Sequence, residues 1–486
     1  MPCPDLPPDV LNSVLWLASP RSTCYTQRGR QALISLCLTS RAWKDTIYGN
    51  PRFWSSLSIA VHDIVDLNTR IPFMELWYSK AGKLKLSLNL KEFKEREYVP
   101  DARRNTPKNH AGFKPAYKFI LKYSTRWERI HFDKVRFSWI NGLVNSLPNQ
   151  DKFVFKNLLH FGAKSTGRYI ESVLPLHEMP KLKSLAVQGK GEFVQFRARF
   201  SGVWDKLRQI ELGIFASMTV HLRILQECGN LEEFTLRGDT TFWYMDRGEF
   251  DEDVMLTEAA RHDIVLRKVH TASFIGFIYT NAILNTLTLP SISTFTIIKP
   301  SASTGTSDLA EQDTDLAVSD LVNRSQCNLQ KLELCCIAIN NERAIKLLKG
   351  IPSLSKLYLE AADIDCTFLL SLKDELHLLE TFQLKVINSD PKAHAYSKFV
   401  KDPRRWWTAL DDTLVKMGQS RNSSVRRLTR LENTFLETSP KNDGDILEPV
   451  YTRVYLRGFD RLDFAETYED TMTEDKPDDV MPMSME

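Results

Sequence analysis

The sequence feature that most constrains the fold of this chain is an apolar pattern, L-x-x-[LIVF]-x-[LIV], that returns through its middle and C-terminal parts. Its first positions are Leu182, Leu207, Leu231, Leu266, Ile292, Leu329, Leu354 and Leu379. Successive gaps of 25, 24, 35, 26, 37, 25 and 25 residues mostly lie within the roughly 20–29 residues of one common class of structural repeat. The pattern predicts stacked units that share one elongated core.

Alternating apolar residues at the end of each unit predict a short strand with one face turned inward. Helix-like runs such as 220–225 and 344–348 lie between units. We therefore predict an α/β fold in which an irregular leucine-rich-repeat solenoid carries parallel strands on its concave face and helices outside. Weaker units are indicated at 127–132 and 158–161, and the fourth unit ends in Thr271 where an apolar residue is expected. An ordinary α/β domain with coincident spacing is the alternative.

The N-terminal sixty residues have a different pattern. Leu6-Pro7-Pro8-Asp9 opens a segment with apolar residues at helical spacing, as proline allows at a helix start. A loop is predicted at 19–30, a second helix at 31–39, and a third helix from Ser40 that stops at Asn50-Pro51. Such a bundle is too small to bury its apolar residues by itself.

Three motifs of this region occur in a specific order: L-P-P-D-V-L, L-C-L-T-S-R-A-W-K-D and N-P-R-F-W-S-S-L-S-I. Over residues 4–59 they resemble the F-box of basidiomycete, and so fungal, F-box proteins. The segment 76–82, ahead of 84–88, resembles the sequence that follows the box in the same group. The first loop, 20–30, is longer than the family pattern. A generic three-helix domain, small α-helical but unrelated to the F-box, is the alternative.

The resemblance implies a non-catalytic substrate-recognition adaptor of an Skp–cullin–F-box ubiquitin ligase. The box would bind the Skp adaptor subunit and, through it, the cullin. The residues that match the family's exposed apolar edge are Leu6, Pro7, Val10 and Leu11. Those that match its core and second contact area are Leu38, Trp43 and Trp54. A scaffold that binds the Skp subunit or a target without delivering ubiquitin is the alternative.

A protein target is expected on the concave face, because residues between inward leucines point there. The residues predicted to bind the target are Lys268, His270, Lys331, Glu333, Lys356 and Tyr358. The three lysines would form a basic row beside Tyr358, which suits an acidic or phosphorylated segment. Loops at the rim of the array and the inserted segments are alternative sites.

We predict four regions: an F-box at 1–60, a linker and post-box segment at 61–125, a repeat domain at 126–465 and a disordered acidic tail at 466–486. The tail has eight Asp or Glu residues and one Lys. The polar segment 300–315 accounts for the 37-residue gap and is predicted to be a mobile excursion.

The sequence also argues against several function classes. The eight cysteines form no C-x-x-C pair, so neither a zinc site nor a disulfide framework is predicted. No catalytic or phosphate-binding motif is present, so we expect neither enzyme activity nor a cofactor, and we interpret His131, His160 and His270 as structural. The net charge is only +3 and nucleic-acid binding usually needs a denser basic stripe, so no nucleic-acid partner is expected. Without a signal peptide or membrane span, the expected location is the cytoplasm, the nucleus or both.

Overall fold

The computed structural model describes residues 6–18, 27–92, 112, 114–135, 155–164, 179–189, 203–214, 218–238, 263–277, 280–299, 313–363, 368, 381–386, 430–436 and 449–454. The chain divides into two compact units. Unit 1 comprises Met1–Ser293 and Asp320–Cys327, and unit 2 comprises Thr294–Ser319 and Asn328–Glu486. Each unit is considered separately below.

Unit 1 begins with three helices: α1 (Pro8–Ala18), α2 (Gln27–Thr39) and α3 (Arg41–Gly49). The Ser40 hydroxyl caps α3 by accepting a hydrogen bond from the Trp43 N–H at 3.2 Å. Asn50 follows α3 and caps the short 3-10 helix η1 (Pro51–Trp54). The three predicted helices are present, although α2 begins at Gln27, inside the segment predicted to be loop.

Eight strands of unit 1 form one parallel sheet in the order β1-β2-β3-β4-β5-β6-β7-β9. They are β1 (Ser56–Val61), β2 (Leu86–Glu92), β3 (Trp127–Asp133), β4 (His160–Lys164), β5 (Ser184–Gly189), β6 (Gln209–Ile214), β7 (Glu233–Arg237) and β9 (Thr271–Ile275). Strands β8 (Ile264–Val265) and β10 (Leu287–Thr288) form a separate pair.

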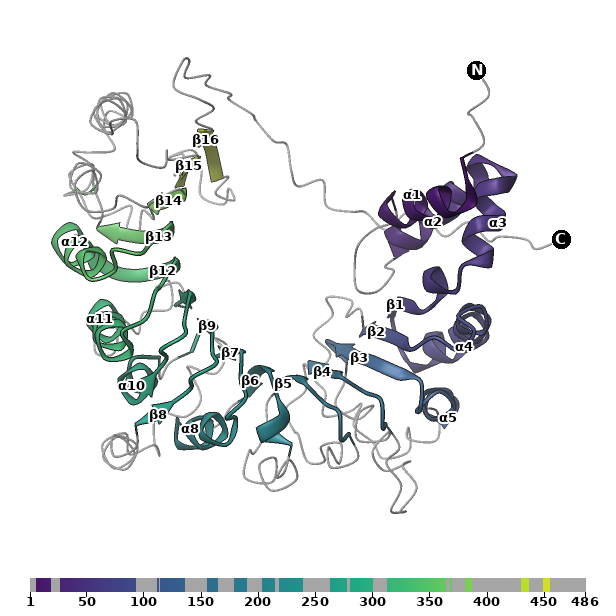
Figure 1. Cartoon of the computed structure of the whole chain (residues 1–486), viewed down its shortest axis with the longest axis horizontal. Helices are drawn as coiled ribbons and strands as arrows, with labels where there is room; N and C mark the ends of the chain where they lie inside the picture. Colours follow the sequence, from purple (N-terminus) through teal and green to yellow (C-terminus); the bar gives the residue numbers. More distant parts are fainter. Residues whose placement is uncertain are drawn as a thin grey trace, which may run out of the picture. The chain divides into compact units, whose positions relative to one another are not determined.

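Helices of unit 1 lie between the strands along the chain. They are α4 (Ile64–Ser79), α5 (Lys114–Lys122), α8 (Met218–Glu227) and α10 (Thr280–Thr286), with a 3-10 turn, η5 (Trp204–Lys206), before β6. Figure 1 shows α4, α5 and α8 on one face of this sheet. The other face, which carries the alternate residues of each strand, is called the polar face here.

The repeated apolar residues form the core, as the pattern predicts. At the three positions of the units that start at Leu182, Leu207, Leu231, Ile292, Leu329 and Leu354, every side chain is at most 3% exposed. The register aligns them from strand to strand, so that Leu185 pairs with Ile210 and Val187 with Leu212. Each unit therefore buries its apolar face against its neighbours, which a single unit could not do.

Two tryptophans occupy the first position of earlier units that the leucine pattern indicates weakly or not at all. Trp54 precedes the buried Leu57 and Ile59 of β1 as Trp127 precedes the buried residues of β3. Each indole N–H donates to the carbonyl of the residue seven positions earlier, Ile47 for Trp54 at 3.0 Å and Ile120 for Trp127 at 2.8 Å. Helix α3 is thus placed before β1 as α5 is placed before β3.

The sheet starts earlier in the chain than the predicted boundary at residue 126. Strand β1 lies in the predicted F-box, and α4, β2 and α5 lie within 61–125, the predicted linker and post-box segment. Strand β2 pairs in parallel with both β1 and β3. The linker was predicted from the charges and prolines of 91–118, and the short alternation of Leu86, Leu88 and Leu90 just before it was not recognised as a strand. Residues 93–111 lie outside the described residues.

The predicted register of the fourth unit is wrong by three residues. Phe234 of β7 pairs with Ala272 of β9, so Val269 takes the first core position rather than Leu266. Leu266 is buried elsewhere, with its N–H bonded to the Thr288 carbonyl beside the β8–β10 pair. The pattern failed because Ala272 is smaller than the residues it allows at the second position.

Unit 2 contains β11 (Thr294–Ile298), β12 (Lys331–Asn340), β13 (Lys356–Asp363), β14 (Thr381–Val386) and β15 (Arg430–Leu436), which pair in parallel. Strand β16 (Pro449–Val454) pairs antiparallel to β15, and neither of these two strands was predicted. Helix α12 (Asn341–Lys349) packs on β12. Helix α11 (Thr314–Ser325) is divided between the units.

A buried ion pair joins the two helices within unit 2. The Arg343 guanidinium at the start of α12 binds both carboxylate oxygens of Asp315, with Nε at 2.8 Å from Oδ2. Asp315 is buried, and its ordinary hydration is replaced by this bidentate pair. The side chains of β14 to β16, residues 300–312 and the acidic tail lie outside the described residues. The predicted excursion at 300–315 is wrong at its end, because Thr314 and Asp315 are buried at the start of α11.

Candidate interaction surfaces

An apolar stripe runs along the solvent side of α1. It consists of Leu6, just before the helix, and Val10, Val14 and Leu17, all exposed. Their spacing of four, four and three residues places them on one side of the helix. Leu11 and Leu15, on the other side, are buried. Helix α1 is therefore apolar on two sides, and the described part of the chain covers the side of Leu11 and Leu15.

Exposed apolar side chains are concentrated in these first helices. Of the fourteen large apolar side chains exposed among the described residues, eight lie before residue 50. They include Ile34 and Leu38, one turn apart on α2, and Leu38 is 81% exposed. A concentration of this kind on a small helical region is typical of a protein interaction site.

The residues predicted to contact an Skp subunit fall into three groups. Leu6, Pro7, Val10 and Leu38 are exposed, and Trp43 is half-buried. Leu11 is only 6% exposed, so its assignment to an exposed edge is wrong. Trp54 is also 6% exposed and belongs to the first repeat rather than to a free surface. Leu6, Val10 and Leu11 belong to one motif, but the helical spacing turns Leu11 to another side than Leu6 and Val10.

Two cations connect the N-terminal helices to the first repeat. Arg30 of α2 donates to the Ser58 carbonyl of β1, and its guanidinium lies 6.0 Å from the ring centroid of Phe73 on α4. Lys80 Nζ, just after α4, lies 4.1 Å from the Tyr48 ring and 4.5 Å from the Trp54 ring. Burial, and then the charge of Arg70, lower the pKa of Arg30.

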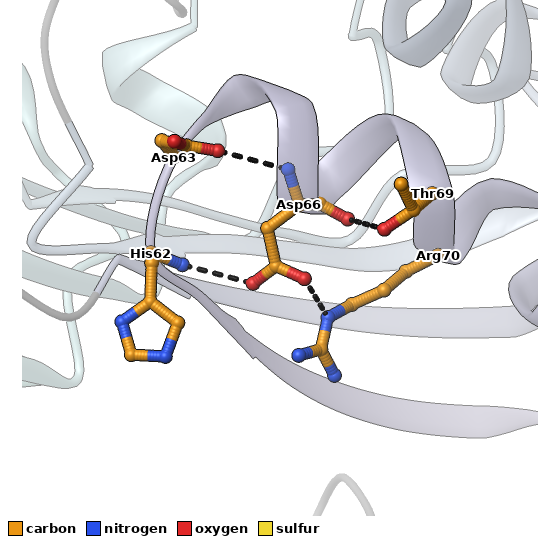
Figure 2. Close-up of polar contacts among 5 residues, drawn as sticks. All are labelled: His62, Asp63, Asp66, Thr69 and Arg70. Atoms are coloured by element: carbon orange, nitrogen blue, oxygen red, sulfur yellow. Dashed lines mark hydrogen bonds and ion pairs between the residues drawn. The ribbon is translucent and has the colours of Figure 1, made fainter. Parts of the chain in front are cut away.

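Hydrogen bonds at the start of α4 fix the helix that carries part of this connection (Figure 2). The Asp63 carboxylate caps α4 by accepting from the Asp66 N–H at 2.8 Å. Asp66 in turn accepts from the His62 N–H at 3.0 Å and from Arg70 Nε at 2.6 Å. Burial raises the pKa of Asp66, but these hydrogen bonds and the Arg70 charge outweigh it and hold the pKa below its usual value.

The polar face of unit 1 has a row of small residues between large polar ones. His131 of β3 is followed across the register by Gly162 of β4, Ala186 of β5 and Glu211 of β6. A Cβ atom on Gly162 would lie 1.9 Å from His131 Nδ1, so the imidazole covers the glycine. Only glycine leaves room for the ring in this position.

An ion-pair network spans the same row. Glu211 accepts from Lys164 Nζ at 2.9 Å and from Arg237 Nε at 2.6 Å. Lys164 lies on β4, two strands from Glu211 on β6, so this contact spans β5. Burial raises the pKa of Glu211, but the two cations outweigh it and hold the pKa below its usual value. Alternation along β6 places Glu211 on this face, but it does not indicate the partners of Glu211.

The six residues predicted to bind a target do not form one row. Lys268 and His270 precede β9, and the register gives their predicted places to Thr271 and Ser273. Lys268 Nζ instead donates to Asn230 Oδ1 at 2.6 Å, while His270 Nδ1 lies 3.1 Å from the Thr271 hydroxyl. This part of the predicted site is a consequence of the wrong register of the fourth unit.

The four remaining residues are neighbours in unit 2. Lys331 pairs in register with Lys356, and Glu333 with Tyr358. Lys331 Nζ lies 3.2 Å from the Glu333 carboxylate, and the Tyr358 hydroxyl donates to Glu360 at 3.2 Å. Glu333 therefore neutralises Lys331, one of the two predicted lysines, which weakens the attraction of this pair for an anion.

The described part of the chain contains His, Cys, Asp and Glu side chains, the residues that most often bind metal ions. No set of three or more His, Cys, Asp or Glu side chains there is placed to bind a metal ion. Burial, followed by the charge of Lys164, lowers the pKa of His131, so this imidazole is neutral near pH 7. Among the described helices, none is long and apolar enough to cross a bilayer.

Comparison with known proteins finds no family model and no curated protein that match the chain. One solved structure that it resembles is titled "Crystal structure of TLR13-ssRNA13 complex", with a TM-score of 0.25 and 14% sequence identity. The match covers 57% of this chain and 44% of that chain, so this chain spans less than half of its length. The repeat sheet described above therefore rests on the strand register and the buried apolar rows of this chain itself.

Proposed function

We propose that this chain is a non-catalytic adaptor of an Skp–cullin–F-box ubiquitin ligase. Its N-terminal helices would bind the Skp subunit, and its repeat sheet would hold a protein target. The observation that carries the proposal is the apolar stripe of Leu6, Val10, Val14 and Leu17, because an exposed apolar surface on a small bundle favours a bound partner. The F-box resemblance names the partner.

The contacts between the N-terminal helices and the sheet support a protein in which one part binds the Skp subunit and the other binds the target. The Trp54 indole of the first repeat donates a hydrogen bond to the Ile47 carbonyl of α3. Arg30 and Lys80 add contacts to β1, α4 and η1. A bound Skp subunit would thus be held at a fixed position relative to the first repeats. An adaptor needs this property if it is to present a target to a transfer enzyme at a constant distance.

Affinity purification of the tagged full-length chain tests the proposal. The Skp and cullin subunits should co-purify, and Leu6→Ala/Val10→Ala should reduce the retained Skp subunit at least about tenfold, since buried apolar contacts dominate such interfaces. Val65→Ala/Leu76→Ala is the matched control, because both side chains lie on α4 and are at least as exposed.

The outcomes separate the alternatives. Retention of Skp without cullin would favour a scaffold that delivers no ubiquitin. If the wild-type chain retains no Skp subunit, or if the control loses as much as the stripe variant, the docking assignment is wrong.

A further inference from the structure

Basic residues gather in the turns that precede three consecutive strands, β4, β5 and β6. These turns comprise residues 155–159, 179–183 and 203–208. Their exposed basic residues, called the basic rim here, are Lys156, Lys181, Lys183, Lys206 and Arg208. Asp205 is the one acidic residue in these turns.

The register brings the basic rim together at one edge of the sheet. Ser184 of β5 pairs in register with His160 of β4 on one side and with Gln209 of β6 on the other. The N-terminal ends of these three parallel strands therefore lie side by side. Backbone bonds continue this order into the turns, with the Arg208 N–H donating to the Lys183 carbonyl at 2.8 Å. Neighbouring strands lie about 4.8 Å apart, so the three turns that carry the basic rim lie next to one another at this edge.

The repeat itself does not require these charges. The equivalent turns before β11, β12 and β13, residues 290–293, 327–330 and 352–355, contain no charged residue. Their exposed positions are filled by Ser, Asn, Gln and Pro. Solvation of a turn therefore does not explain the basic rim, and the repulsion between its like charges must be offset by something else.

Few acidic groups neutralise the basic rim. Arg208 pairs with Glu232 at 3.1 Å, and Lys181 Nζ donates to the neutral Asn157 side chain at 3.1 Å. Within the described part of the chain, Lys156, Lys183 and Lys206 have no carboxylate at ion-pair distance. The edge of the sheet thus presents exposed positive charge over three repeats.

We propose that the basic rim binds an Asp- and Glu-rich segment of a partner protein. The inference rests on the proposed function where the partner is the target of the adaptor. It assigns target binding to an edge of the sheet of unit 1 rather than to the strands of unit 2. A protein segment fits better than a nucleic acid, because Asp205 and Glu232 interrupt the cations. In addition, the aromatic rings of these turns, Phe155 and Trp204, are buried and cannot stack on bases.

A binding assay on the full-length chain tests the proposal without any ligase subunit. The probe is a fluorescein-labelled peptide of alternating Glu and Ser. Lys183→Glu/Lys206→Glu should weaken its binding at least about tenfold at low salt, since opposite charges are replaced by like ones. Lys331→Glu/Lys356→Glu changes the net charge equally and should alter binding less than about twofold.

Each outcome decides the matter. Added salt should weaken binding of the wild-type chain, because the contact is between exposed charges. Absence of peptide binding, or equal losses in both variants, would overturn the assignment. Tighter binding of oligo(dT) of the same charge would make the basic rim a nucleic-acid site instead. If the chain binds the peptide but does not retain the Skp subunit, the basic rim is supported as a binding site and the adaptor proposal is wrong.

Discussion

The N-terminal helices and the repeat sheet of unit 1 differ in how much of their apolar surface is exposed. Helices α1 and α2 expose a stripe and a further pair of aliphatic side chains, while the core positions of the repeats from Leu182 to Leu236 are at most 3% exposed. The sheet can bury its rows because each strand has a neighbour with the same pattern. Among the described residues, α1 buries Leu11 and Leu15 and leaves the stripe on its other side exposed.

The largest expected effect separates two tryptophans of the predicted docking motif. Trp54→Ala should lower the free energy of unfolding by about 3–5 kcal/mol, because its buried ring supports the first repeat. Trp43→Ala should cost only about 1–2 kcal/mol, because the ring is half-buried. Urea denaturation of the full-length chain measures both. Equal costs would show that the boundary between the helices and the first repeat is misplaced.

Two adjacent residues of α1 give the next largest contrast. Leu15 is fully buried, and Leu15→Ala should destabilise the chain by about 2–4 kcal/mol. Val14 belongs to the exposed stripe, and Val14→Ala should change stability by no more than about 0.5 kcal/mol. The same urea titration compares them. A substantial loss for Val14→Ala would mean that the stripe is covered within the chain.

A smaller effect is expected at the helix cap that precedes the aromatic contacts of α4. Asp63→Ala should cost about 1 kcal/mol, because the Asp66 N–H loses its acceptor at the first turn. Amide hydrogen exchange in α4 should report the local loss. Asp63→Ser should restore most of the protection, since serine is also a good cap. Failure of this rescue would indicate that the carboxylate acts by charge rather than as a cap.

The smallest expected effect is a pH dependence confined to the sheet. The pKa values of His131 and His160 are lowered by burial first and by neighbouring cations second, so their neutral forms are favoured in the folded chain. The stability they contribute is present above about pH 6.5 and is lost as the pH falls through their lowered folded values. Residues 6–55 contain no histidine.

Hydrogen exchange at several pH values tests this difference between the regions. Amides of β3 and β4 should exchange faster, relative to a pH-corrected reference, below about pH 6, while those of α1 should not. His131→Gln should flatten the response of β3. A uniform response in helices and sheet would contradict the assignment to these imidazoles.

The apolar repeat predicted much of the sheet, and its failures have physical causes. The strands of the units at Leu182, Leu207 and Leu231 are found where predicted, because a leucine at these spacings has few alternatives to burial. Units whose first position holds a tryptophan were indicated weakly or missed. The Ala272 unit was placed in the wrong register, since alanine carries too little apolar signal to set it.

The predicted contact residues were less accurate than the predicted strands. Leu11 shares a motif with the exposed Leu6 and Val10 but points into the core, whereas the burial of Trp54 agrees with its predicted match to the family's core and second contact area. Lys331 has an acidic neighbour on its own strand, which alternation alone does not reveal as a partner. The network of Lys164, Glu211 and Arg237 joins three strands, β4, β6 and β7, so no local pattern indicates it.

The sequence by itself determined the period of the repeat, the inward rows of each strand and the presence of three N-terminal helices, because these depend on the local spacing of apolar residues. The tertiary structure alone decided which motif residues stay exposed and that the Trp54 indole joins the first repeat to α3. It also decided that three turns with five exposed cations lie at one edge of the sheet. The reason is that exposure and charge clustering depend on which segments become neighbours. Parallel strands align residues about 25 positions apart, a relation that stacking creates and no local spacing contains.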